Sequence, residues 1–191
     1  MGLLLPLKIK IAYWFERRKL TKMFKTLKSV GRNVYLCKGT TFSGHKNVTI
    51  GNHVWIGRNG KFAGEGGLTI KDGVIISHNV EIWTSNHYFQ GSDLRSIPYD
   101  KRFIYKPVII GENVWVGSRV IITPGVSIGE GAIVGAGAVI SKDIASCAIV
   151  AGNPAKIIRY RDTEQYYRLK AEGKIYLKEN YNYDISPNRL I

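Results

Sequence analysis

Branched aliphatic residues recur at every sixth position through the second half of the chain. From residue 110 the sequence reads IGENVW, VGSRVI, ITPGVS, IGEGAI, VGAGAV and ISKDIA. The first position of each unit is Ile or Val, and the fifth is Val, Ala or Ile. An α-helix does not produce this pattern, because steps of about 100° carry every sixth residue to a different helix face. The pattern therefore predicts short strands separated by turns.

Alternation within a strand assigns the positions of each unit to two sides. The fifth residue of one unit and the first of the next are two apart, so they share a face, and the sixth points away. Units this short enclose a core only when the chain coils and its turns stack into parallel sheets. The fourth position is expected to adopt positive φ at the turns. The residues expected in this conformation are Asn113, Gly125, Gly131, Gly137 and Asp143.

The same spacing occurs earlier, at Ile50, Ile56 and Phe62, and restarts at Ile70, Ile76 and Ile82. It is weak between residues 34 and 47, so the repeating region covers about residues 34–150. The spacing then stops between Ile82 and Ile110. The sequence predicts a loop over residues 86–107, whose Pro107 suits re-entry into a strand.

These units, with Ile or Val first and Gly often second, resemble those of the hexapeptide-repeat acyltransferases, and VAGNPAKIIRYR resembles that family's closing signature. The maltose, galactoside and capsule-polysaccharide O-acetyltransferases are the members that the chain resembles over about residues 34–161. The resemblance implies an all-β fold, a left-handed parallel β-helix with three units per turn, and short N-terminal and C-terminal helices. The expected parts are a basic helical segment at 1–33, the acyltransferase domain at 34–157, and a C-terminal helix and tail at 158–191.

The resemblance also implies a reaction, the transfer of an acetyl group from acetyl-CoA to a hydroxyl of a sugar or polysaccharide precursor. The family places its catalytic histidine at the base of a loop such as 86–107, and His87 occupies the matching place. A neutral imidazole is suited to take the hydroxyl proton near neutral pH. The other histidines, His45, His53 and His78, are expected to be solvated surface residues.

Residues for acetyl-CoA follow from the same resemblance. A backbone N–H at Gly117 or Ser118 would hold the thioester carbonyl oxygen, and basic side chains would meet the phosphates of coenzyme A. No metal is required. The expected donor-binding residues are Trp115, Gly117, Ser118, Ala136, Ser141, Lys142, Lys156 and Arg159.

Apolar residues at the sixth position are expected to point outward. They are Trp115, Ile121, Ile133 and Val139. An outward apolar surface is unfavourable for a monomer in water. Members of the family are typically trimers with the donor and acceptor in the groove between neighbouring coils, so we expect a homotrimer.

Charge adds a possible partner surface. The 191 residues include 28 Lys and Arg against 14 Asp and Glu, a formal net charge of +14, which points to an anionic partner. Residues 1–30 are basic, with apolar residues at helical spacing. This segment fits either an amphipathic helix on an anionic membrane or a helix that caps the core. No nucleic-acid motif accompanies the charge, so no nucleic-acid partner is expected.

The compartment is inferred from the cysteines and from the N-terminus. Cys37 and Cys147 make neither a disulfide framework nor a structural zinc site, and buried reduced thiols suit the cytoplasm. No apolar run approaches the roughly 20 residues that span a bilayer. We therefore expect a cytoplasmic protein, with peripheral membrane contact through residues 1–30 as one interpretation.

Other functions stay open at this stage. The acceptor-binding acidic and amide residues of the maltose and galactoside enzymes have no clean counterpart here. N-acetylation of a nucleotide-linked amino sugar, acetylation of an antibiotic, and a non-catalytic β-helix scaffold are the alternatives. A zinc hydrolyase of the γ-carbonic-anhydrase type needs two histidines within about five residues, whereas His45 and His53, the nearest pair, are eight apart.

Overall fold

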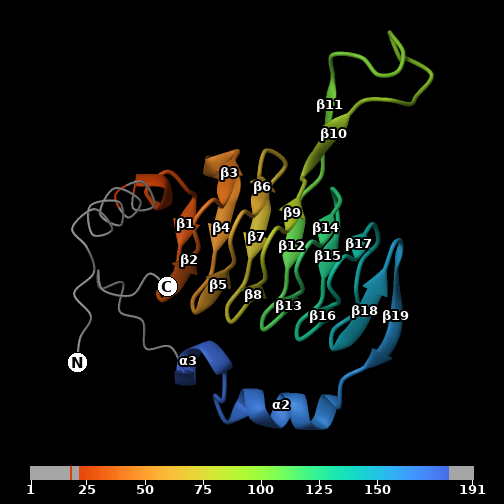
Figure 1. Cartoon of the computed structure of the whole chain (residues 1–191). Coiled ribbons are helices and arrows are strands. Elements are labelled where there is room, and N and C mark those ends of the chain that lie inside the picture. Colours follow the sequence, from red (N-terminus) through yellow and green to blue (C-terminus); the bar gives the residue numbers. More distant parts are fainter. Residues whose placement is uncertain (1–17, 19–21, 181–191) are drawn as a thin grey trace.

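The protein is a left-handed parallel β-helix, described by a computed structural model at residue 18 and residues 22–180. Figure 1 shows the strands stacked along one axis, with a hairpin rising from one side of the coil and two helices on the opposite side. The predicted fold class is confirmed. Most of the basic segment expected at residues 1–33 lies outside the described residues.

Three parallel sheets form the sides of the coil. Sheet A consists of β1 (Ser29–Val30), β4 (Val48–Ile50), β7 (Leu68–Ile70), β12 (Val108–Ile110) and β15 (Ser127–Ile128). Sheet B consists of β2 (Val34–Leu36), β5 (Val54–Ile56), β8 (Ile75–Ile76), β13 (Trp115–Val116), β16 (Ile133–Val134), β18 (Ala148–Gly152) and the antiparallel β19 (Ala155–Tyr160). Sheet C consists of β3 (Thr41–Ser43), β6 (Lys61–Ala63), β9 (Glu81–Ile82), β14 (Ile121–Ile122) and β17 (Val139–Ile140).

One turn of the coil contains fewer residues in the second half of the chain than in the first. Trp55 pairs with Ile75, twenty residues further on, whereas Trp115 pairs with Ile133, eighteen further on. The extra residues of the early turns lie at the corner between sheets C and A, hereafter the C–A corner. Residues 64–67 connect β6 to β7 there, and the 3-10 helix η1 (His45–Asn47) lies between β3 and β4. This longer corner explains why the six-residue spacing restarts at Ile70.

The core is a set of aliphatic ladders inside the coil. The first and fifth positions of the repeat are buried as alternation predicts, and each turn adds side chains of the same kind to the ladder. Burying one such side chain stabilises the fold by roughly 1.5–3 kcal/mol. The first positions are Ile110, Val116, Ile122, Ile128, Val134 and Ile140.

Most corners use left-handed backbone at the expected fourth position. Asn113 and all three predicted glycines have positive φ, but Asp143 does not. The Asp143 carboxylate instead accepts a hydrogen bond of 2.8 Å from the backbone N–H of Ser127 in the previous turn. Arg119 has φ 60 at the equivalent position of its own unit, although its residue type gave no such indication.

The interruption of the repeat is an antiparallel hairpin rather than a plain loop. β10 (Ser85–His87) pairs with β11 (Phe103–Tyr105), and the chain enters β12 directly after Pro107. The hairpin leaves from the C–A corner, where earlier turns already carry extra residues. Its strands were missed because backbone groups that leave the coil pair with each other, and three-residue strands carry little periodic signal.

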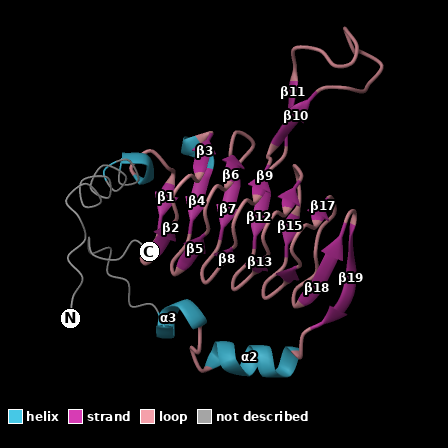
Figure 2. Cartoon of the chain, in the orientation of Figure 1, coloured by secondary structure: helices cyan, strands magenta, loops and turns pink. Residues whose placement is uncertain are grey.

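Two helices follow the coil, as Figure 2 shows in cyan. α2 (Thr163–Ala171) is capped at its N-terminus by Asp162, whose carboxylate accepts from the N–H of Gln165 at 2.9 Å. α3 (Tyr176–Asn180) was not predicted. Among the described residues, no helix has the length and apolar character needed to cross a membrane.

Candidate functional site

His87 ends strand β10 on the exposed hairpin. Its imidazole stacks on Tyr99, with ring centroids 3.8 Å apart and planes inclined by 15°. Phe103, its partner across the hairpin, lies at 4.6 Å. No hydrogen bond joins the ring nitrogens of His87 to another described residue, so the two aromatic rings are its main side-chain contacts. Both ring nitrogens are therefore open to a bound molecule.

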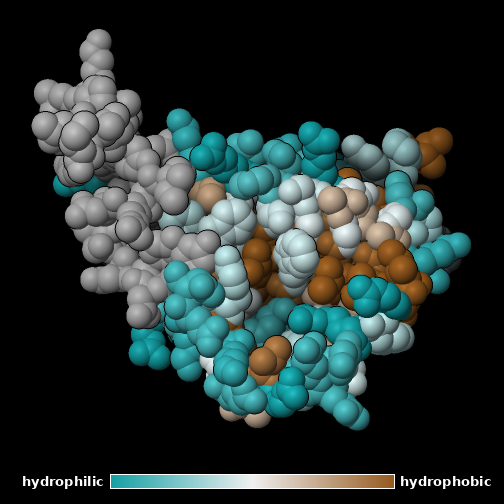
Figure 3. All heavy atoms as spheres, turned by 60° about the horizontal axis from the view of Figure 1, so that its bottom comes forward, coloured by the Kyte–Doolittle hydropathy of each residue, from teal (hydrophilic) through white to brown (hydrophobic). Residues whose placement is uncertain are grey.

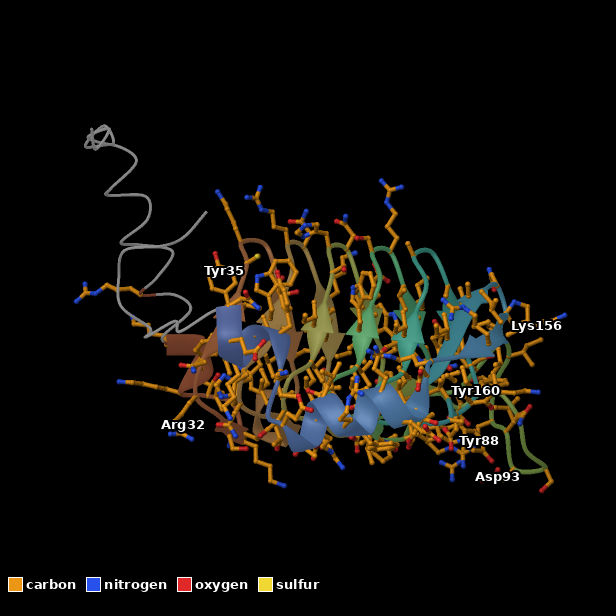
Figure 4. The ribbon with its side chains drawn as sticks, turned by 90° about the horizontal axis from the view of Figure 1, so that it is seen from below. Arg32, Tyr35, Tyr88, Asp93, Lys156 and Tyr160 are labelled. Atoms are coloured by element: carbon orange, nitrogen blue, oxygen red, sulfur yellow. The ribbon has the colours of Figure 1, made fainter. Side chains whose placement is uncertain are left out.

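Arg102 organises the far part of the hairpin. Its guanidinium donates to both carboxylate oxygens of Asp100 and to the carboxylate of Asp93, and it lies 4.0 Å from the ring centroid of Tyr88. These hydrogen bonds hold the pKa of both carboxyl groups below the usual range. The Tyr88 hydroxyl donates to Asp93 at 2.6 Å, which completes the cluster. Figure 4 labels Tyr88 and Asp93 on this segment.

Thr84 anchors the hairpin to the coil. Its fully buried hydroxyl donates to the carbonyl of Ala63 at 2.7 Å and accepts from the N–H of Gly66 at 2.8 Å. Its carbonyl accepts from the N–H of Lys106 at 2.9 Å, which joins the two ends of the segment that leaves the coil, hereafter the excursion. A Cβ at Gly66 would lie 2.1 Å from that carbonyl oxygen, so only glycine permits this approach.

Gly117, Ser118 and Ala136 lie at the corner between sheets B and C, hereafter the B–C corner. The N–H of Gly117 donates to Val134 at 2.8 Å and is not free for a thioester. The N–H of Ser118 makes no hydrogen bond within the described residues, because Ala136, above it in the next turn, has no acceptor side chain. Of the two amides proposed for the thioester carbonyl, Ser118 is therefore the candidate.

Trp115 and Arg159 belong to one outward row on sheet B. Trp115 pairs with Ile133, Ile133 with Ile149, and Ile149 with Arg159. Trp115 is 52% exposed. In Figure 3 apolar atoms gather in the middle of the face shown, between polar margins. Figure 4 shows Lys156 and Tyr160 of β19 at one end of the coil.

Ser141 and Lys142 follow β17 at the C–A corner. The hairpin that carries His87 leaves from the same corner two turns earlier, after β9. Sheet C therefore separates His87 from Ser118, which lies at the B–C corner. One copy of the chain places the predicted base and the predicted thioester contact at opposite edges of sheet C, and does not bring them together.

The remaining histidines hold neighbouring turns together. His45 bonds the carbonyl of Phe42 through Nε2 and Thr26 through Nδ1, and His53 contacts the Asn33 amide at 3.2 Å. His78 accepts from the N–H of Arg58 at 2.9 Å. Only His78 is exposed, so the expectation of solvated rings is wrong for His45 and His53, which are half-buried.

The described residues contain no cluster of three or more His, Cys, Asp or Glu side chains able to hold a metal ion. Cys37 and Cys147 are buried and unpaired, and burial raises the pKa of both thiols.

Sequence reasoning missed Thr84, Tyr99, Asp100 and Arg102. Asp93, Asp100 and Arg102 are charges of opposite sign within ten residues, a signal that indicates an internally bonded segment. Their contacts with Tyr88, the residue that follows His87, were not predictable, because those contacts depend on the hairpin register.

Known proteins match the chain in its repeats and in its fold. The family model described as bacterial transferase hexapeptide (six repeats) matches residues 107–142. No curated protein matches the chain in sequence.

Three solved acetyltransferases share the fold. A galactoside acetyltransferase in complex with coenzyme A is 27% identical, with a TM-score of 0.69, over 86% of this chain and 88% of that one. A hexapeptide-repeat acetyltransferase from Vibrio cholerae O1 biovar eltor, complexed with acetyl coenzyme A, is 26% identical, with a TM-score of 0.67, over 76% and 77%. A maltose O-acetyltransferase from Clostridium difficile 630 is 26% identical, with a TM-score of 0.65, over 81% and 89%.

The repeat signature at residues 107–142 and the β-helix that contains it are features that this chain shares with solved hexapeptide-repeat acetyltransferases.

Proposed function

We propose that the chain transfers an acetyl group from acetyl-CoA to a hydroxyl of a sugar or polysaccharide precursor, with His87 as the general base. The observation that carries this proposal is the position of His87. It lies on the one excursion from the described coil, its ring contacts are aromatic, and its nitrogens are available to an acceptor hydroxyl. Neutral imidazole is suited to that proton transfer.

Coenzyme A as the acyl carrier is supported by the likeness to acetyltransferases solved with coenzyme A or acetyl-CoA. Lys142, Lys156 and Arg159 are exposed cations on the last turn and β19. Such side chains suit the phosphates of the donor. The free N–H of Ser118 is suited to stabilise negative charge on the thioester oxygen.

A homotrimer would complete this site. Because sheet C separates His87 from Ser118 within one copy, acyl transfer needs the base of one copy to face the donor surface of its neighbour. Outward apolar side chains at Trp115, Ile121, Ile133 and Val139 supply a surface for that contact.

The function is tested by incubating the full chain with acetyl-CoA and a panel of neutral sugars, acidic oligosaccharides and nucleotide-linked amino sugars. Release of the coenzyme A thiol, together with an acetyl mass gain on the acceptor, identifies the substrate. Hydroxylamine cleaves an ester and leaves an amide intact, so it separates O-acetylation from N-acetylation. We expect an ester on a sugar hydroxyl.

Transfer to amines alone would contradict the proposed acceptor. Failure to bind coenzyme A in calorimetry would contradict the proposed donor.

A further inference from the structure

The β10–β11 hairpin has two different faces. Directly opposite residues of an antiparallel pair share a face, and successive residues alternate. His87 pairs with Phe103 and therefore lies on the same face, whereas Asn86 and Ile104 point to the other. Tyr99, in the segment that returns toward β11, adds its ring to the His87 face.

Burial alone does not fix the rings beside His87. Tyr99 is 45% exposed and Phe103 is 48% exposed, so each retains much of its contact with water. An aromatic pair contributes about 0.5–1.5 kcal/mol beyond its burial, which is modest for a side chain on an exposed segment. Other contacts must hold the backbone that carries these rings.

Asp100 and Arg102 supply those contacts at the neighbouring positions. Asp100 directly follows Tyr99 and is only 6% exposed. Its carboxylate accepts from the Arg102 guanidinium at 2.6–3.1 Å, from the backbone N–H of Arg102 at 2.9 Å and from that of Arg95 at 3.2 Å. Arg102 directly precedes Phe103, so one ion pair holds the backbone next to both rings.

The same ion pair is joined to β10. The N–H of Tyr88 donates to the carbonyl of Arg102 at 2.9 Å, and the N–H of Asp100 donates to the carbonyl of Tyr88 at 3.1 Å. Tyr88 follows His87 in the chain. These hydrogen bonds therefore hold the backbone at the position next to each of the three rings, those of His87, Tyr99 and Phe103.

We propose that Asp100 and Arg102 are positioning residues, which orient the His87 imidazole for proton transfer by holding Tyr99 and Phe103 against it. This inference rests on the proposed role of His87. A general base must come within about 2.6–3.2 Å of the proton that it takes. No hydrogen bond from another described residue holds the His87 ring nitrogens, so the stacked rings set its orientation.

The orientation can be measured without an acceptor. In protein with isotope-labelled histidine, ring currents from Tyr99 displace the His87 ring-proton resonances upfield, and the His87→Ala variant identifies them. In Asp100→Asn and Arg102→Met we expect this displacement to shrink. Lys61→Met, which removes the exposed Lys61–Glu81 ion pair on sheet C, is the control and should leave the resonances unchanged.

Kinetics with the acceptor supply the second readout. Asp100→Asn and Arg102→Met should lower kcat by about 5-fold to 100-fold, since displacement of a catalytic group by about 1 Å can lower the rate by about 100-fold. The KM for acetyl-CoA should change less than twofold. Tyr99→Phe should retain the upfield resonances and most of kcat, whereas Tyr99→Leu should lose both.

Unchanged His87 resonances in folded Asp100→Asn and Arg102→Met protein would overturn the positioning role, whatever the rates. Wild-type turnover in His87→Ala would instead overturn the proposed base. The two failures are therefore distinguishable.

Discussion

Single hydrogen-bonded side chains determine where the hairpin leaves the coil. Thr84 satisfies two backbone groups of the previous turn, and Gly66 leaves the space that this contact needs. Both residues lie in stretches where the six-residue spacing is disturbed. Local polar contacts therefore replace the aliphatic ladder at the point where the repeat stops.

Removal of the Thr84 hydroxyl should destabilise the protein. In Thr84→Val the N–H of Gly66 and the carbonyl of Ala63 lose their side-chain partner inside the fold, which costs about 1–3 kcal/mol. Denaturant unfolding of Thr84→Val and Thr84→Ser measures the difference. Thr84→Ser keeps the hydroxyl and should remain close to the wild type. Equal stability of Thr84→Val and the wild type would show that these bonds contribute nothing.

At the scale of elements, the coil was predictable and the hairpin was not. Six aliphatic first positions at a constant spacing predict a coil of stacked short strands, whereas its three sides and its left-handedness were implied by the resemblance to the family. By contrast, Ser85, Asn86 and His87 carry no alternation, and their strand forms only because Phe103–Tyr105 returns beside them. Similarly, Arg119 adopts positive φ because the turns above and below impose it.

For the candidate site, individual residues could be predicted from the sequence through its resemblance to a family. The arrangement of these residues in space could not be predicted. His87 and Ser118 could be nominated from motifs, but their separation by sheet C depends on which corner each motif occupies. The Asp100–Arg102 contact depends on the hairpin register in the same way.

Helix α2 is held to the coil by Tyr166 and Lys170. The Tyr166 hydroxyl donates to Glu130 at 3.0 Å and accepts from Asn113 at 3.2 Å, and the Lys170 ammonium lies between Glu112 and Glu130. Burial raises the pKa of Tyr166 to about 12. Hydrogen bonds to the two glutamates raise the pKa of Lys170.

The docking of α2 should therefore weaken at alkaline pH. The pKa of Tyr166 is higher in the folded protein than the value of about 10 expected when unfolded, so its contribution is complete below about pH 10 and is lost as the pH rises through about 12. The difference between absorbance titrations of the wild type and Tyr166→Phe isolates this phenol. A midpoint near 10 would contradict the buried position of Tyr166.

At the scale of the whole molecule, the outward apolar residues predict self-association, and the resemblance to the family implies that the assembly is a trimer. Sedimentation should give a mass near three times 21.4 kDa. Ile133→Asp should shift the mass toward the monomer, since a carboxylate is costly to bury in an apolar contact, whereas Lys61→Met should not. A stable and active monomer at micromolar concentration would contradict the shared site.

The excess of positive charge predicts a lipid-binding surface that is separate from the cations expected to bind coenzyme A. Residues 1–30 should favour anionic lipid by about 1 kcal/mol for each cation near the surface, and salt should weaken this attraction. Co-sedimentation of the full chain with anionic vesicles at low salt, compared with a chain that lacks residues 1–30, measures the effect. If neither form binds the vesicles at low salt, the interpretation of the segment as a helix that caps the core is favoured instead.

Turnover of His87→Ala tests the central claim most directly. With the acceptor found in the panel, kcat for acetyl transfer should fall by about 10²–10⁴. Calorimetry should show nearly unchanged coenzyme A binding, because the donor residues lie on other parts of the coil. Lys61→Met serves as the matched control and should turn over like the wild type. Wild-type turnover in folded His87→Ala protein would contradict the account.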